Sequence, residues 1–215
     1  MITLLHTSPA HIPVFDALRD AHHPGVELRH LVHEDLLARA REAGPQAVAE
    51  KVRDVVAGAA RDGAHAVLCT CSTIGAVAEE AAAGVPVLRV DRPMAAEAVR
   101  SDAIVVVATV ASTLAPTFDL IADEALRAGR TPRVRTVLVE GAFERFSVGD
   151  LPGSLELVDR AVAGIRAAGD ETVVLAQVSL AGAAGAGVLA SPRGGLAAAV
   201  AAAAGAAVAP GRPNG

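Results

Sequence analysis

Tyrosine and tryptophan are absent from this chain of 215 residues, and phenylalanine occurs only four times. Proteins that bind single-stranded nucleic acids stack the bases on aromatic side chains, so the composition argues against that class. The chain also lacks an excess of basic residues, because its formal net charge is -5 at pH 7. Binding to a phosphate backbone requires a basic surface. We therefore expect no nucleic-acid partner.

Cysteine and long hydrophobic runs are scarce as well. Cys69 and Cys71 are the only cysteines, and a disulfide between residues this close on a strand would be strained. The apolar start, Met1–Leu5, does not resemble a signal peptide. The alanine-rich run Leu196–Val208 is too short for a membrane span and reads as a terminal helix. We expect a cytoplasmic protein with reduced thiols and no membrane partner.

Cofactor motifs are missing too. The Cys-x-Cys pair has no evident further metal ligands. Gly182, Gly185 and Gly187 lack the strand, spacing and acidic residue of a dinucleotide fingerprint. We expect neither a metal nor an organic cofactor.

What the chain does contain is an alternation of apolar runs and helical segments. Hydrophobic residues make up 52% of it, enough at this length for a sizeable core. Strands bounded by glycines and separated by amphipathic helices indicate a parallel sheet. The expected strands are Ile2–Leu5, Val26–Val32, Ala66–Thr70, Val85–Val90, Ala103–Ala108, Arg133–Val139, Thr172–Ala176 and Gly187–Ala190. The expected helices are Pro13–Ala21, Gln46–Asp62, Thr73–Ala83, Met94–Arg100, Leu114–Ala128, Leu155–Ala168 and the terminal helix.

The sequence repeats itself. Residues 51–68 align without a gap to residues 157–174, and Ile2–Leu5 corresponds to Ile104–Val107. The chain thus looks like two copies of one unit. We expect an α/β fold of two pseudo-symmetric Rossmann-like half-domains with parallel sheets and a site in the cleft between them. Residues 1–100 would form the first half, onto which part of the C-terminal region can pack, 101–209 the second, and 210–215 a disordered tail.

Cys71 lies at a predicted strand-to-helix turn, which is where α/β proteins carry their chemistry. The positive end of a helix dipole favours the thiolate form. Cys71 is therefore a candidate base or nucleophile, whereas Cys69 reads as a packing residue. The alternative for Cys71 is a small buried residue that closes a strand. The duplication aligns Cys71 with Gln177, so the second half carries no thiol.

Hydroxyl-bearing residues accompany the predicted strand ends. A base of modest strength removes a proton next to a carboxylate only if the enediolate is stabilised in a preorganised pocket. Hydroxyl and amide groups suit this purpose, and we expect them to hold a substrate carboxylate rather than to react. The candidate substrate-binding residues are Thr7, Ser8, Ser72, Thr73, Thr109, Ser112, Thr113, Gln177, Val178 and Ser179.

Several ionisable residues have two interpretations each. His6 and His11 either pair with Cys71 or are exposed loop histidines, and exposure is favoured for His11. Arg89 and Arg92 either recognise a second carboxylate or, as we favour, are solvated or ion-paired. Glu140 reads more readily as a solvated side chain than as an acid or base.

The turn Cys71–Thr73, the loop Ala108–Thr113 and the segment Leu189–Arg193 resemble motifs of the aspartate/glutamate racemase superfamily. That superfamily also includes hydantoin racemases, maleate isomerases and arylmalonate decarboxylases. The resemblance spans almost the whole chain. It implies catalysis without a cofactor on a small carboxylate or amino acid, with Cys71 in the place of one catalytic thiol and Ser72 in the place of the usual asparagine.

One departure from the family pattern bears on the reaction. The second family thiol follows a glycine in the second half, where this chain has Ala176–Ser179. A racemase with two thiols removes a proton from one face of the substrate and returns one to the other. With Cys71 alone, the chain is either a racemase-type isomerase with another second base, a one-thiol lyase such as a decarboxylase, or a carboxylate-binding protein without catalysis. Assembly into a homo-oligomer is left open.

Overall fold

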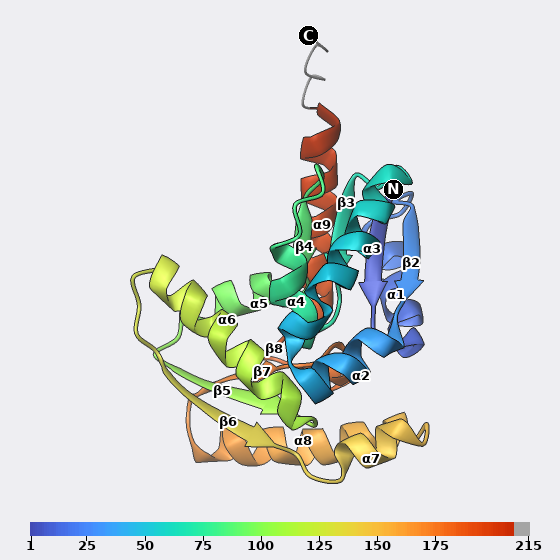
Figure 1. Ribbon diagram of the computed structural model, residues 1–215. Coiled ribbons are helices and arrows are strands. Elements are labelled where there is room, and N and C mark those ends of the chain that lie inside the picture. The colour runs from blue at the N-terminus through green and yellow to red at the C-terminus, as the bar shows by residue number, and fades with distance from the viewer. Residues whose placement is uncertain (209–215) are drawn as a thin grey trace. The chain divides into compact units, whose positions relative to one another are not determined.

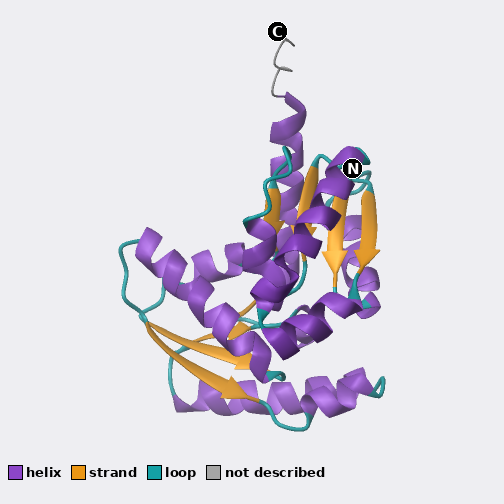
Figure 2. Cartoon of the chain, in the orientation of Figure 1, coloured by secondary structure: helices purple, strands orange, loops and turns teal. Residues whose placement is uncertain are grey.

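The computed structural model describes residues 1–208 of the chain, which divide into two compact units (Figures 1 and 2). One unit contains Met1–Thr70, Ile74–Arg89 and the described residues from Leu196 onward. The other contains Cys71–Thr73 and Val90–Gly195. The tail expected over residues 210–215 lies outside the described residues.

The first unit contains a parallel sheet in the strand order β2-β1-β3-β4. Its central strands are fully buried and mostly apolar, as expected when helices cover both faces of a parallel sheet. The strands are β1 (Ile2–His6), β2 (Leu28–Val32), β3 (Ala66–Cys69) and β4 (Val87–Arg89). The helices are α1 (Ile12–His22), α2 (Glu34–Ala43), α3 (Ala49–Arg61) and most of α4 (Ser72–Glu79), with short 3-10 turns η1 (Pro9–His11) and η2 (Pro45–Val48).

The second unit repeats this plan with the strand order β6-β5-β7-β8, again all parallel. Its strands are β5 (Ala103–Ala108), β6 (Arg133–Leu138), β7 (Thr172–Leu175) and β8 (Val188–Ala190). Its helices are α5 (Arg92–Ala98), α6 (Leu114–Arg127), α7 (Ala142–Ser147) and α8 (Leu151–Ala168), with 3-10 turns η3 (Ala111–Thr113) and η4 (Val178–Ala183). The last helix, α9 (Ser191–Val208), begins in this unit and continues in the first.

The two sheets share not only strand order but also register. Ile2 pairs with Ala66 between β1 and β3, and Ile104 pairs with Thr172 between β5 and β7. These four positions are equivalent in the sequence alignment of the two halves. The structure thus confirms the expected two-unit α/β fold, and it places Cys71 and Gln177 at the same position, two residues after the ends of β3 and β7.

The sheet of the second unit separates two hydrophobic layers. Ile104, Val106 and Val174 pack with α5 and α6 on one face, and Val105, Val107 and Val173 pack with α8 on the other. Figure 1 shows α6 and α8 on opposite sides of β5 and β6. Successive side chains of a strand point to opposite faces, so alternate residues of β5 contribute to the two layers. This sheet is the scaffold that positions the loops after β5 and β7.

Two helices, α2 and α7, are present where no element was predicted. Helix α2 does carry a helix signal, because Glu34 and Asp35 lie in its first turn and favour the positive end of its dipole. The terminal helix begins at Ser191, five residues before its predicted start. Within residues 1–208, none of the helices combines the length and the apolar character that crossing a membrane requires.

Candidate active site

Cys71 lies in the turn between β3 and α4, and its side chain is 8% exposed. It forms no disulfide with Cys69, which is fully buried in β3. The hydroxyl of Ser72 donates a hydrogen bond of 2.8 Å to the backbone carbonyl of Ala176. This bond attaches the turn Cys71–Thr73 to the carboxyl end of β7, and the turn packs as part of the second unit.

Gln177 joins the loops that follow β5 and β7. Its Oε1 accepts hydrogen bonds from the backbone N–H of Thr109 at 2.7 Å and from the Thr109 hydroxyl at 3.1 Å. Both residues stand directly beyond the carboxyl ends of neighbouring strands, where parallel strands present their loops. The position equivalent to Cys71 is therefore occupied by an amide that holds the Thr109 loop in place.

The predicted hydroxyl donors of the second unit fall into two groups. Thr113 donates to the carbonyl of Val110 at 2.6 Å and so stabilises its own turn. The hydroxyls of Thr73 and Ser112, in contrast, are buried and have no hydrogen-bond partner among the described residues. Buried hydroxyls are normally hydrogen-bonded, and an unsatisfied one is costly. Among the predicted site residues, Thr73 and Ser112 therefore carry the hydroxyls that a bound acceptor would satisfy.

Val178 and Ser179 open η4, directly after Gln177. Val178 is buried and Ser179 is half-buried. Thr7 and Ser8 follow β1 in the other unit. Thr7 is buried, whereas the Ser8 hydroxyl accepts from the backbone N–H of Ala10 and caps η1. Thr7 is the counterpart of Thr109, because each follows directly on the first strand of its sheet.

The structure excludes the exposed alternative for His6, and the favoured exposure of His11 is wrong because that residue is half-buried. His6 is the last residue of β1 and is 0% exposed. Burial, followed by the nearby rings of His30 and His11, lowers the pKa of His6 to about 3. Burial likewise lowers the pKa of His11 to about 4. Both rings are therefore neutral at physiological pH.

Sequence reasoning did not single out the partners of His6. Its Nδ1 lies 2.8 Å from the hydroxyl of Thr70, and its Nε2 lies 2.8 Å from Nδ1 of His30. The Nε2 of His30 in turn lies 3.4 Å from Oδ1 of Asp16. Partners that are 24 and 64 residues away leave no local pattern in the sequence. Only the parallel pairing of β1 with β2 and β3 brings them together.

The charged candidates have different surroundings. Arg92 forms ion pairs with Asp123 and Glu124 of α6, in agreement with the favoured interpretation. Arg89 is buried at the end of β4, with its guanidinium against Gly75, so the interpretation of Arg89 as a solvated residue is wrong. Glu140 is exposed. Among the residues that the structure describes, no group of three or more metal-ligating side chains forms a metal site.

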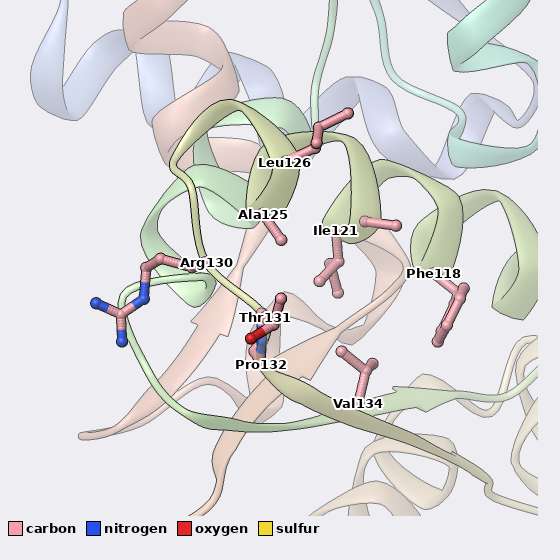
Figure 3. Close-up of a pocket in the computed structure, with 9 residues that line it drawn as sticks. Phe118, Ile121, Ala125, Leu126, Arg130, Thr131, Pro132 and Val134 are labelled. Atoms are coloured by element: carbon pink, nitrogen blue, oxygen red, sulfur yellow. The ribbon is translucent and has the colours of Figure 1, made fainter.

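An apolar hollow of about 370 Å³ lies between α6 and the start of β6 (Figure 3). Phe118, Ile121 and Val134 line it, and the guanidinium of Arg130 points away from it. The hollow is at the amino end of β6, whereas Thr109 and Gln177 follow the carboxyl ends of β5 and β7. It contains none of the candidate site residues, so we place the chemistry at the carboxyl ends of the strands instead.

No known protein-family profile matches the sequence, and no curated protein matches it at the sequence level. Solved structures match the fold over nearly the whole chain. The aspartate racemase of Picrophilus torridus aligns with a TM-score of 0.69 and 12% identity, over 96% of this chain and 94% of that one. The allantoin racemase of Klebsiella pneumoniae aligns with a TM-score of 0.60 and 18% identity, over 95% and 86%. Arylmalonate decarboxylase aligns with a TM-score of 0.56 and 18% identity, over 99% of this chain and 95% of that one. At these identities the similarity is one of fold, and function has to be argued from the site.

Proposed function

We propose that this protein, which has the fold of the aspartate/glutamate racemase superfamily, is an isomerase or racemase that acts without a cofactor on a small carboxylate or amino acid. Cys71 is the group that removes or returns a proton on one face of the carbon next to the carboxylate, and inversion of that carbon uses a second acid or base on the opposite face. Thr73, Ser112 and the backbone around Gln177 hold the carboxylate and stabilise the enediolate. The fold alone would not support an activity.

The observation that carries the proposal is that two of the predicted site residues, Thr73 and Ser112, have buried hydroxyls without partners in the same compact unit as the thiol. Thr73 is two residues from Cys71 in the turn that Ser72 attaches to β7. A carboxylate has only acceptor oxygens when ionised, so it satisfies donors of this kind. Preorganised donors that stabilise developing negative charge are usually the largest contribution to catalysis of such reactions.

A second candidate, a one-thiol lyase, is favoured by Gln177. The amide occupies the position equivalent to Cys71 and cannot exchange a proton at neutral pH. A decarboxylation needs only one proton, delivered to one face of the enediolate, so a single thiol is sufficient. A third candidate, a carboxylate-binding protein, would use the same donors without turnover.

The deciding experiment is deuterium incorporation in heavy water, followed by mass spectrometry over a panel of small carboxylates and amino acids. The isomerase proposal predicts exchange at the carbon next to the carboxylate, and Cys71→Ala should reduce it by about 10²-fold to 10⁴-fold, the usual contribution of a general base. Cys69→Ala is the matched control, because it removes the neighbouring buried thiol and should leave exchange unchanged.

Each alternative has its own signature in the same experiment. Release of carbon dioxide without exchange into unreacted substrate would favour the lyase. A ligand that binds equally well to the wild type and to Cys71→Ala without any reaction would favour the binding protein. Full exchange activity in Cys71→Ala would overturn the role of the thiol.

A further inference from the structure

The side-chain amide of Gln177 has an oxygen and a nitrogen, and the protein itself uses only the oxygen. Oε1 accepts hydrogen bonds from the backbone N–H and from the hydroxyl of Thr109, at 2.7 and 3.1 Å. Nε2 donates to no group of the described residues, and it is not among the buried polar atoms that lack a partner. The NH2 group is therefore accessible and can donate two hydrogen bonds to another molecule.

The chemistry of the contact with Thr109 fixes which way the amide faces. A backbone N–H can only donate a hydrogen bond, so the atom that it approaches at 2.7 Å is the oxygen of the amide. The reversed amide would set two N–H groups against each other and leave the partly buried N–H of Thr109 without an acceptor, which is costly. With Oε1 held on Thr109, both hydrogens of Nε2 point away from that residue. Gln177 is thus preorganised as a donor.

Gln177 also lies near the turn that carries the thiol. The hydroxyl of Ser72 donates to the carbonyl of Ala176 at 2.8 Å, and Cys71 and Gln177 are the sequence neighbours of these two residues. With standard backbone dimensions, this bond limits the distance between the Cα atoms of Cys71 and Gln177 to about 12 Å. All four residues belong to the second unit. The thiol and the amide therefore border the same part of one unit.

The same unit contains two further groups that can donate, the hydroxyls of Thr73 and Ser112. Both are buried and have no hydrogen-bond partner within the described part of the chain. An ionised carboxylate has only acceptor oxygens, so it can accept from these hydroxyls and from Nε2 of Gln177 alike. An ammonium group can only donate and cannot bond to Nε2. The amide thus favours an anionic oxygen over a cationic group.

We propose that Gln177 is a specificity-determining residue, whose Nε2 donates a hydrogen bond to a carboxylate oxygen of the substrate while Thr109 holds its Oε1. The inference rests on the proposed function, which assigns a small carboxylate to this site. A thiol at this position would exchange a proton with the substrate. The amide keeps its protons at neutral pH and serves only to bind the carboxylate and to stabilise the negative charge that develops on it.

The first test uses the scarcity of side-chain amides in this chain. Only Gln46, Gln177 and Asn214 have one, so the ¹⁵N–¹H spectrum contains three NH2 pairs. Labelled Cys71→Ala protein, which avoids turnover, is titrated with malonate, succinate and the other carboxylates of the exchange panel. We expect the Gln177 pair, assigned by its absence in Gln177→Glu, to move downfield while the pair of the exposed Gln46 stays in place. No movement of the Gln177 pair with any carboxylate would overturn the proposal.

The second test is Gln177→Glu, which keeps an acceptor oxygen for Thr109 and replaces the NH2 group by a second acceptor. The probe is the panel carboxylate that causes the largest shift, and its Kd is measured by titration calorimetry. We expect the Kd to rise at least about tenfold at pH 7, because a donor to a charged group is lost and like charges are brought together. The ratio to the wild type should shrink towards pH 5, as the introduced carboxyl group gains a proton and can donate again.

Gln46→Glu is the matched control, because it makes the same chemical change at the other glutamine of the chain, which is exposed in the first unit. Its Kd should equal that of the wild type. An unchanged Kd in Gln177→Glu would overturn the role of Gln177 even if Cys71→Ala abolishes exchange. Conversely, a raised Kd in Gln177→Glu together with full exchange in Cys71→Ala would leave Gln177 as the carboxylate donor and reject the proposed role of the thiol.

Discussion

At the scale of single residues, Gln177 shows how the second unit differs from the first at the position equivalent to Cys71. The duplication aligns it with Cys71, yet its amide serves the structure by accepting two hydrogen bonds from Thr109. Sequence comparison of the two halves predicted the position of Gln177 correctly. It did not predict the contact with Thr109, because the two residues are 68 positions apart and meet only through the pairing of β5 with β7.

Replacing Gln177 by leucine should destabilise the protein by about 1–3 kcal/mol, because the partly buried N–H of Thr109 loses its acceptor. Gln177→Glu keeps an acceptor oxygen in the same place and should lose clearly less. Urea denaturation measures both. An equal loss in the two variants would show that the shape of the side chain matters rather than its hydrogen bonds.

At the scale of secondary structure, the predictions succeeded where apolar periodicity is strong. Strand β5 matches its predicted bounds of Ala103–Ala108, and all eight strands were expected near where they occur. Helix α2 was missed because its sequence is dominated by charged residues, and α7 because it is only six residues long. The surroundings of His6 were left open between two alternatives, because its hydrogen-bond partners are distant in the sequence and come from other strands.

The start of α9 depends on a glycine. A Cβ atom on Gly195 would lie 2.4 Å from the carbonyl oxygen of Val90, and backbone cannot move aside as a side chain can. We expect Gly195→Ala to destabilise the protein by about 1–3 kcal/mol, in the range of other overpacking substitutions. Chemical denaturation measures the change.

Gly205 provides the matched control in the same helix, because a Cβ atom added there would have nothing within 4 Å of it. Gly205→Ala should stabilise the helix by about 0.5–1 kcal/mol through better helix propensity. If Gly195→Ala were as harmless as Gly205→Ala, the close approach of α9 to Val90 would not hold in solution.

At the scale of the whole molecule, the internal alignment predicted two copies of one α/β unit, and the two units of the structure have the same strand order and register. The environments of equivalent side chains in the two halves were less predictable, because different residues occupy these positions. His6 is part of a buried polar chain, whereas its counterpart Ala108 is packed in the core of α5 and α6. The location of the site in a cleft between the halves and a cytoplasmic setting stay predictions.

The buried histidines should make the folded protein sensitive to acid. The unfolded chain binds a proton on each ring below about pH 6.5, whereas folded His11 and His6 bind theirs only near pH 4 and pH 3. The unfolded state therefore binds more protons within this window, and stability falls as the pH drops through it. The urea midpoint should decrease as the pH falls from about 6.5 to about 4.

His11→Leu removes one of these two rings and should flatten that decrease, since leucine binds no proton. The exposed His22 is the control, and His22→Leu should leave the slope unchanged. The same slope in all three proteins would mean that the histidines are not neutral in the folded state.

The hydrogen bonds between Gln177 and Thr109 also limit which side chains position 177 tolerates. A cysteine at this position would remove the oxygen acceptor on which the Thr109 loop depends. A second thiol equivalent to Cys71 could therefore be engineered here only together with a compensating change near Thr109.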